Sequence, residues 1–396
     1  MTYLPTAEHD ELRAVVRELA EERIAPRATE IDQRAEFPWD LKELLARQDL
    51  LGSSFEERYG GTELDEISQV ILVEEVARAD ATTSLIPIVQ KLGSLPITMA
   101  GSEEQKERYF PRLASGEWLI AFGLTEAAAG SDVAANRMRA RRDGDAYVLN
   151  GSKRFITHGS IANVLTVFAL TDPEAGGRKG MSAFIVETDT PGFSSPRSEH
   201  KLGIRGSPTA ELQFDDVGVP VQNRLGDEGE GFKIAMETLD RSRLGIAAQA
   251  VGIAQGALDA AVGYAGEREQ FGQRIGEFQG IQFMLADMAS QTEAARQLTY
   301  AAAARVEAHA ADLPYWTSTA KLIAGDTAMR VTSNAVQIFG GYGYITEYPV
   351  ERMMRDAKIT QLYEGTQQIQ RLVIGRQLLH RAGVRGRVRA GSAARS

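Results

Sequence analysis

The spacing of the apolar residues changes twice along the chain, and this change constrains the fold more than any other feature. Up to about Arg112, apolar side chains recur at the spacing of one helix face. From Trp118 to about Gly231 they form short β-branched or aromatic runs, and from Phe232 onward the helical spacing returns. The sequence therefore predicts an α+β protein of several domains. These are an N-terminal helical domain (residues 1–117), a middle antiparallel β-barrel or sandwich domain (118–231) and a C-terminal helical bundle (232–381).

Turn residues give the limits of the expected elements. In the first domain, Pro87 and Pro96 are expected to break the helical pattern. The expected strands of the middle domain are residues 118–124, 137–142, 146–149, 164–170, 181–186 and 211–214, with hairpin turns at Asp143-Gly144 and Asn150-Gly151. The expected helices of the last domain are residues 232–267, 278–311 and 314–339 and a helix after Thr366. Residues 382–396, rich in Arg, Gly, Ala and Ser, are expected to form a flexible tail.

Composition and charge disfavour several classes of function. Hydrophobic residues make up 43% of the 396 residues and charged residues 25%, as in ordinary globular proteins. The net charge of −10 opposes binding to nucleic acid, and no apolar stretch reaches the ~20 residues of a membrane span. We therefore expect no nucleic-acid partner and no membrane insertion. The chain has no cysteine and begins without the apolar run of a signal peptide, so we expect a cytoplasmic location.

The commonest catalytic and nucleotide-binding motifs are absent from the sequence. There is no Gly-x-Ser-x-Gly elbow and no phosphate loop, and the 5 histidines never fall at the spacing of metal ligands, so no metal site is expected. Gly341-Tyr342-Gly343 begins like a dinucleotide fingerprint but follows a helical stretch and lacks the third glycine. Nucleotide binding would therefore need another architecture.

Several segments remain that could carry chemistry, although each also has an ordinary structural interpretation. Residues 122–132 leave a strand and enter a loop of small and hydroxyl residues, and residues 154–159 place an aromatic ring and a hydroxyl in a strand that ends at glycine. Residues 268–272 and 337–343 are typical of helix ends. Tyr363-Glu364-Gly365-Thr366 places a carboxylate on a tight turn before a helix, where a lone glutamate is commonly a surface residue.

Taken together, in this order and at this spacing, these segments resemble the acyl-CoA dehydrogenase family from about Thr6 to about His380. The resemblance implies an N-terminal helical domain, a middle β-domain and a C-terminal four-helix domain, which agrees with the apolar pattern. It also implies non-covalently bound FAD, an acyl-CoA substrate and a homotetramer. Electron-transferring flavoprotein is the electron acceptor that it implies.

The resemblance makes Glu364 the catalytic base, which removes the pro-R α-proton of the acyl thioester while the β-hydrogen leaves as hydride to flavin N5. Burial over an apolar pocket can raise the pKa of a glutamate to ~6–7, which suits a base near neutral pH. In the family the backbone N–H of the base and a flavin ribityl hydroxyl polarise the thioester carbonyl. The implied product is the trans-2-enoyl-CoA.

The same resemblance implies two further sets of site residues. The cofactor-binding set is Phe122, Leu124, Thr125, Gly130, Ser131, Phe155, Thr157, Arg268, Phe271, Gln337, Gly340, Gly341, Thr366 and Gln368. Within this set, the residues from Arg268 to Gly341 are implied to reach FAD across a subunit boundary. The substrate-binding set is Ser131, Asp240, Arg243, Tyr363 and Gly365. Asp240 and Arg243 have the spacing of an ion pair within one helix, which is their alternative role.

The chain departs from the family pattern at several positions. Alanine at position 127 replaces the more usual proline, Phe155 replaces tryptophan and His158 replaces asparagine. Phe155 keeps the stacking surface but loses the indole N–H, and we expect His158 to be a hydrogen-bonded loop histidine rather than a tuning group. Ser242 stands where some branched-chain members carry their base, and serine cannot take that role.

Residues 201–209 and 244–249 look closest to short-chain and branched-chain members, so a short acyl-CoA is the expected substrate. Alternatives remain open on the same scaffold. One is a flavin-dependent oxidase or monooxygenase, and another is a decarboxylating dehydrogenase of the glutaryl-CoA type. A non-catalytic helical scaffold is a further alternative, which a colourless protein that does not take up FAD would favour.

Overall fold

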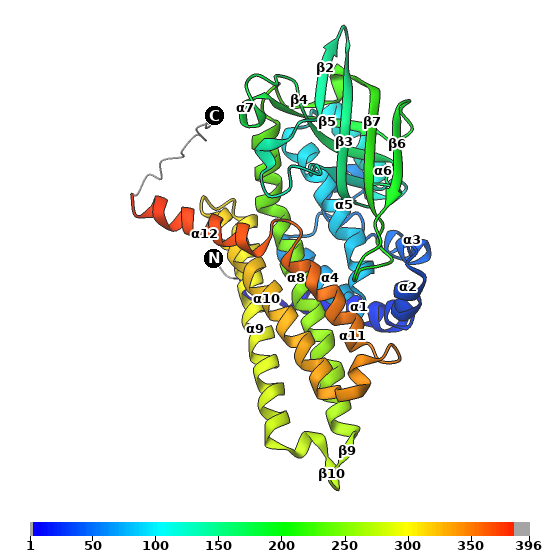
Figure 1. Ribbon diagram of the computed structural model, residues 1–396, viewed down its shortest axis with the longest axis vertical. Coiled ribbons are helices and arrows are strands. Elements are labelled where there is room, and N and C mark those ends of the chain that lie inside the picture. The colour runs from blue at the N-terminus through cyan, green and yellow to red at the C-terminus, as the bar shows by residue number, and fades with distance from the viewer. Residues whose placement is uncertain (1–2, 384–396) are drawn as a thin grey trace, which may run out of the picture.

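The computed structural model describes residues 3–383. Figure 1 shows a molecule with a β-sheet at one end of its long axis and long helices running from beside the sheet to the other end. The expected tail at residues 382–396 lies outside the described residues except for Ala382 and Gly383, which form a turn after the last helix. The order of helical, sheet and helical parts agrees with the apolar pattern.

The first part of the chain is helical, with α1 (Ala7–Leu19), α2 (Ala28–Arg34), α3 (Trp39–Arg47), α4 (Glu66–Ala79), α5 (Ala81–Ala100) and α6 (Glu103–Ala114). Asp80 separates α4 from α5, because its carboxylate accepts from the Thr83 N–H (2.8 Å) and caps the second helix. The expectation that Pro87 and Pro96 break the helix is wrong, since both lie inside α5. Most of α5 is buried against α4, α8 and β1, and this packing outweighs the two lost hydrogen bonds.

The middle part folds into one sheet of β1 (Ile120–Gly123), β2 (Arg139–Asp143), β3 (Ala146–Thr157), β4 (Val164–Leu170), β5 (Met181–Glu187), β6 (Phe193–Ser198), β7 (Thr209–Pro220) and β8 (Arg224–Leu225). The strand order is β6-β7-β3-β2-β4-β5-β8, and β1 pairs with β4. The expectation of a purely antiparallel sheet is wrong, because β4 pairs in parallel with β1 and with β2. No hairpin joins these strands, and a parallel pair needs a longer connection.

Two dipeptides that look alike in sequence, Asp143-Gly144 and Asn150-Gly151, adopt different structures in the sheet. Gly144, with φ 63°, lies in the tight turn between β2 and β3, as expected. The second expected turn, Asn150-Gly151, is wrong, because both residues lie inside β3. Gly151 has φ 139° and the register with β7 shifts between Leu149 and Gly151. A glycine inside a strand commonly marks such a bulge.

The last part contains α8 (Gly231–Glu267), α9 (Gln279–Glu307), α10 (Leu313–Phe339), α11 (Val350–Ala357) and α12 (Gln367–Arg381), with a small hairpin of β9 (Glu269–Gln270) and β10 (Gln273–Arg274) before α9. Helix α8 packs against α9, α10, α4 and α5, so it joins the first and last helical parts. By length and composition α8 could span a membrane, but 72% of its most apolar window is buried inside the protein. That degree of burial is typical of the core helix of a folded domain.

Candidate active site

The turn that carries Glu364 joins the short helix η8 (Lys358–Gln361) to α12. Glu364 has φ 55° and Gly365 has φ 90°, so both residues adopt the left-handed conformation. This conformation is unfavourable for glutamate and persists only where the surroundings fix it. Lys321 Nζ donates to the Gly365 carbonyl (2.7 Å), and Gln370 Nε2 donates to that carbonyl (2.8 Å) and to the carbonyl of Glu364 (3.1 Å). These hydrogen bonds restrain the turn from two helices.

The carboxylate of Glu364 meets α8. Ser242 donates from Oγ to Glu364 Oε2 across 2.8 Å. Burial raises the pKa of Glu364 above its usual value, while the Ser242 hydrogen bond and the charges of Arg243 and Lys321 act in the opposite direction. A carboxylate whose pKa is raised by loss of water is a stronger base than an exposed one, so this site favours proton abstraction.

Lys321, which the sequence analysis missed, is a buried lysine that contacts the turn carrying Glu364. Its Nζ also donates to Gln367 Oε1 (3.2 Å), so it contacts both the turn and the first residue of α12. Burial lowers the pKa of Lys321 to about 7, and the charge of Glu364 opposes that shift. The detectable signal was a lysine among the buried alanines Ala320, Ala324 and Ala328 on α10, since a buried lysine almost always has a partner.

Tyr363 and the Asp240–Arg243 pair lie close to the base turn. The hydroxyl of Tyr363 donates to Gln249 Oε1 on α8. Arg243 is buried and pairs with Asp240, so the alternative role of these residues as an ion pair within one helix is confirmed. Burial raises the pKa of Asp240, although the charge of Arg243 opposes the shift. Arg243 Nε has no hydrogen-bond partner within residues 3–383, which leaves one donor of a buried cation free for a ligand.

Two of the segments predicted to bind the cofactor meet at one face of the sheet. The Arg154 N–H donates to the Thr125 carbonyl across 2.8 Å, which joins the end of β1 to β3. Phe155 is 58% exposed with φ 58°, and Thr157 is partly buried at the end of β3. Phe155 therefore presents a largely exposed apolar ring, with the Arg154 guanidinium 5.3 Å from its centroid. Gly130 and Ser131 are exposed in the loop after β1.

The other predicted residues near this face have mainly structural roles. Leu124 is buried, and the ring of Phe122 packs edge-on against Phe168 with centroids 5.1 Å apart. Thr366 caps α12, because its hydroxyl accepts from the Ile369 N–H (3.3 Å). The next predicted residue, Gln368, is exposed on α12.

Lys153 is a second buried cation that the sequence analysis missed. Its Nζ donates to the Leu124 carbonyl (3.1 Å), to Glu126 Oε1 (2.9 Å) and to Asn136 Oδ1 (2.8 Å). Glu126 in turn accepts from the backbone N–H of Met138 (3.0 Å). The Lys153–Glu126 ion pair therefore joins the loop between β1 and β2 to strand β3, and the sequence around Lys153 gave no signal of this pair.

A separate pocket lies at the end of α10, beside the β9–β10 hairpin. Its volume is about 420 Å³, and it is lined by Tyr264, Arg268, Gln270, Ile275, Ile338, Phe339, Gly340, Gly341, Tyr342 and Ile345. The pocket thus brings together the predicted residues Arg268, Gly340 and Gly341. Gln337 does not line it, and Phe271 is 95% exposed on the hairpin. Figure 1 places this hairpin at the end of the molecule opposite to the sheet.

Comparison with known proteins agrees with this arrangement over almost the whole chain. Family models match for the acyl-CoA dehydrogenase N-terminal domain (residues 6–117), middle domain (121–217) and C-terminal domain (229–379). The chain belongs to the acyl-CoA dehydrogenase family. This acyl-CoA dehydrogenase is an FAD-dependent oxidoreductase that dehydrogenates acyl-CoA thioesters, and the relatives do not favour the oxidase or monooxygenase alternative.

Three similar proteins illustrate the match. FadE25, a probable acyl-CoA dehydrogenase of Mycobacterium leprae (strain TN), is 52% identical over 372 residues, which cover 94% of this chain and 95% of that protein. Butyryl-CoA dehydrogenase from Megasphaera elsdenii has a TM-score of 0.93 at 46% identity, covering 96% of this chain and 100% of that one. A chain in the structure of the electron transferring flavoprotein of Acidaminococcus fermentans has a TM-score of 0.93 at 48% identity, with coverage of 96% and 100%.

The residues of this acyl-CoA dehydrogenase fit FAD on two observations. Arg268 has no ion-pair partner within the described part of the chain and lies 5.3 Å from the ring of Tyr342, in the pocket with Gly340 and Gly341. An unpaired guanidinium beside glycines that allow close approach suits a pyrophosphate. The exposed ring of Phe155 suits the flat isoalloxazine. In Figure 1 the strand β3, which carries Phe155, lies well away from the β9–β10 hairpin beside Arg268, so one FAD that used both places would bridge two copies.

The expectation of a hydrogen-bonded loop histidine at position 158 is wrong. His158 is 1% exposed, and its Nε2 has no hydrogen-bond partner among residues 3–383. The ring packs edge-on against the ring of Phe37, with centroids 5.1 Å apart, and Phe37 has no group that could form a conventional hydrogen bond with it. Burial lowers the pKa of His158 to about 3, with a smaller contribution from the charge of Lys201. The ring of this enzyme's His158 is therefore neutral at physiological pH.

Proposed function

We propose that Glu364 is the α-proton base of this acyl-CoA dehydrogenase and that its substrate is a short-chain acyl-CoA. One observation carries the proposal: a carboxylate with a raised pKa is fixed by a left-handed turn and by the hydroxyl of Ser242. The similarity to butyryl-CoA dehydrogenase from Megasphaera elsdenii supports the short chain. A short branched acyl group is compatible with the same site.

The two oxygens of Glu364 have different roles in this proposal. Oε2 accepts the hydrogen bond of Ser242, whereas Oε1 has no partner among the described residues and takes the α-proton. The backbone N–H of Glu364 also has no partner there, so it donates to the thioester carbonyl as charge develops on that oxygen. FAD, when bound, accepts the β-hydrogen as hydride, which leaves the trans-2-enoyl-CoA. The cationic groups of Arg243 and Arg268 hold the anionic parts of the ligands.

We also propose that the enzyme passes its electrons to an electron-transferring flavoprotein and that it is cytoplasmic. The first point is supported by the similarity to a chain in the structure of such a flavoprotein from Acidaminococcus fermentans. Reduction of the purified flavoprotein partner by the enzyme and butyryl-CoA tests it, and transfer only to oxygen would contradict it. Cell fractionation tests the location.

A homotetramer is the assembly that we propose. Large apolar side chains are exposed on the β9–β10 hairpin, α9 and α12, among them Phe271, Phe283, Leu372, Leu378 and Leu379. Exposed apolar surface of this extent commonly marks a subunit interface, and the divided cofactor site requires at least a second copy. Light scattering of the FAD-loaded protein tests the assembly against the subunit mass of 43.1 kDa. A monomer with full FAD content would contradict it.

Anaerobic titration with butyryl-CoA tests the proposed chemistry. Wild type is expected to lose its yellow flavin colour and to reoxidise slowly in air. Glu364→Gln is expected to keep FAD and bind butyryl-CoA while the rate of flavin reduction falls by ~10²–10⁴, the range for loss of a general base. Glu347→Gln, at an exposed position outside the turn, is the matched control and is expected to behave as wild type. Normal reduction by Glu364→Gln would refute the base, and release of CO₂ from glutaryl-CoA would favour a decarboxylating enzyme.

A further inference from the structure

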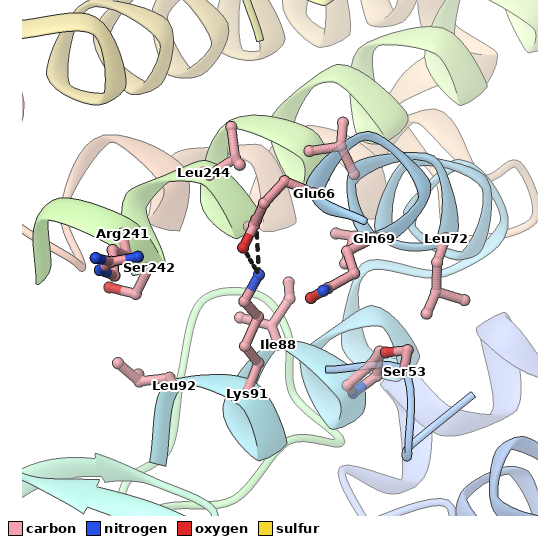
Figure 2. Close-up of a pocket in the computed structure, with 14 residues that line it drawn as sticks. Ser53, Glu66, Gln69, Leu72, Ile88, Lys91, Leu92, Arg241, Ser242 and Leu244 are labelled. Carbon is pink, nitrogen blue, oxygen red and sulfur yellow. Dashed lines mark hydrogen bonds and ion pairs between the residues drawn. The ribbon is translucent and has the colours of Figure 1, made fainter. Parts of the chain in front are cut away.

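A small pocket between α4, α5 and α8 adjoins the base. Figure 2 shows its lining, to which α8 contributes Arg241, Ser242, Leu244 and Gly245. Ser242 lines this pocket and also donates to Glu364, so the pocket begins at the hydrogen-bond partner of the base. An acyl chain that runs past Ser242 places the carbons beyond its reacting α- and β-carbons in this pocket. Its volume of about 30 Å³ exceeds the roughly 10–15 Å³ that one water molecule needs, so the pocket has room for a short group.

An ion pair crosses this otherwise mainly apolar pocket. Lys91 on α5 donates from Nζ to both carboxylate oxygens of Glu66, at 2.7 and 2.9 Å. In Figure 2 the pair lies between Ser242 on one side and Gln69 and Ser53 on the other. The side chains are only 22% and 16% exposed, so both charges have lost most of their water. Glu66 lies in the first turn of α4, where the helix dipole favours its negative charge.

The pair resists displacement because its groups satisfy one another. Each oxygen of Glu66 accepts from the same ammonium, and two apolar side chains, Ile88 and Leu92, flank Lys91 on α5. An alkyl chain that advanced past Ile88 and Leu92 would have to separate the charges or pack against them without water. Both outcomes are unfavourable, since partly buried charges need their partners. No such barrier faces an acyl chain that ends before the pair.

We propose that the Glu66–Lys91 pair divides the acyl pocket and restricts this enzyme to short acyl groups, an inference that rests on the proposed function. The two residues therefore determine specificity and take no part in the chemical step.

A series of butyryl-, hexanoyl- and octanoyl-CoA tests the inference with FAD-loaded enzyme, with kcat/KM and the rate of flavin reduction as readouts. Wild type is expected to prefer butyryl-CoA. Glu66→Leu/Lys91→Met removes both charges and keeps similar volumes, so the ratio of kcat/KM for octanoyl- to butyryl-CoA is expected to rise at least about 10-fold, the lower limit for one methylene in an apolar pocket. An unchanged ratio, or a wild type that prefers octanoyl-CoA, would overturn the inference.

Two further variants separate the charge effect from damage to the fold. Glu66→Lys/Lys91→Glu restores a pair with exchanged partners and is expected to keep the short-chain preference of wild type. Glu103→Leu/Lys106→Met removes a pair of the same types on α6, which does not line the pocket, and is expected to leave the ratio unchanged. A raised octanoyl ratio in either variant would count against the inference. If no acyl-CoA bleaches the flavin of the wild-type enzyme, the proposed function is wrong, and this outcome is distinct from a failure of the inference.

Discussion

Ser242 and Glu364 are 122 residues apart in the sequence, yet the hydroxyl of one donates to the carboxylate of the other across 2.8 Å. The bond joins α8, which runs through the core, to the left-handed turn before α12. It is one of few polar contacts available to a carboxylate that burial has deprived of water. The strength of Glu364 as a base therefore depends on a hydroxyl group from a distant helix.

Ser242→Ala is expected to move the pH dependence of the reaction. The hydrogen bond of Ser242 lowers the pKa of Glu364, so its removal raises that pKa further. The base must be deprotonated, and its active fraction is lost as the pH falls through its pKa, so the acid limb of flavin reduction shifts to higher pH. Stopped-flow reduction by butyryl-CoA across a pH series measures the shift. Ser290→Ala on α9, an exposed serine, is the control, and a Ser242→Ala limb at or below the wild-type position would contradict the prediction.

Lys321→Met is expected to loosen the base turn. It removes the hydrogen bond to the Gly365 carbonyl, although Gln370 still donates to that oxygen. Loss of one such bond is expected to slow flavin reduction and, at a pH near 10.5, where burial of the ammonium no longer opposes folding, to lower the free energy of unfolding by about 1 kcal/mol. Denaturant unfolding and stopped-flow reduction measure the two effects. Equal stability and rate in wild type and variant would show that Gln370 alone holds the turn.

The same lysine predicts a pH dependence of stability. Burial lowers the pKa of Lys321 to about 7, whereas in the unfolded chain the pKa stays near its usual value of 10.5. Between these pH values the unfolded state binds the extra proton, so the free energy of unfolding contributed by this group rises with pH through that window. Unfolding curves of wild type and Lys321→Met at several pH values measure the difference. A steeper rise in the variant than in wild type would contradict the shifted pKa.

The sequence predicted the parts of the site that depend on local order, and it missed those that depend on distant contacts. Glu364, Phe155 and Arg268 each lie in a short segment whose residue order resembles a family, and the structure places each in an exposed or restrained position that suits its role. Lys153 looks like an ordinary lysine in sequence, and Lys321 differs only in the alanines around it, because the partners of both lie in other elements. Their burial becomes visible only once the chain is folded.

The fold shows the same division. The strand at Val164–Leu170 was predicted with its observed limits, because all seven of its residues are apolar or buried and turn residues flank it. The strand β6 (Phe193–Ser198) was missed, since it is mostly exposed and contains Pro196 and Arg197. Edge strands bury few side chains, so periodicity gives little signal for them. Helix α5 was divided at its prolines for the opposite reason, because burial outweighed a local rule.

His158→Asn is expected to leave the pH profile unchanged. The pKa of His158 is about 3, so the ring stays neutral throughout the range in which the base titrates. The residue has φ 59°, a conformation that asparagine adopts readily, so the variant is expected to be no less stable than wild type. Flavin reduction across a pH series and thermal unfolding measure these outcomes. A displaced acid limb in His158→Asn would mean that the ring is charged in the working enzyme.

Gly245→Ala is expected to change both the stability of the enzyme and its range of substrates, whereas a control variant is expected to change the stability alone. A Cβ at this position would lie 3.6 Å from the side chain of Ile88, an ordinary contact, and would fill part of the pocket lined by both residues. Gly263→Ala is the matched control on the same helix, because a Cβ there meets nothing within 4 Å. Both changes are expected to raise the free energy of unfolding by about 1 kcal/mol, the difference in helix propensity between glycine and alanine.

Only Gly245→Ala is expected to narrow the substrate range further, with a fall of about 10-fold or more in kcat/KM for hexanoyl-CoA relative to butyryl-CoA. The reason is that the new methyl group would occupy part of this small pocket and leave less room for further acyl carbons. Denaturant unfolding and steady-state kinetics of the two variants measure these effects. An equal hexanoyl-to-butyryl ratio in Gly245→Ala and Gly263→Ala would show that acyl carbons do not enter this pocket, because the two variants differ only in whether the added methyl group faces it.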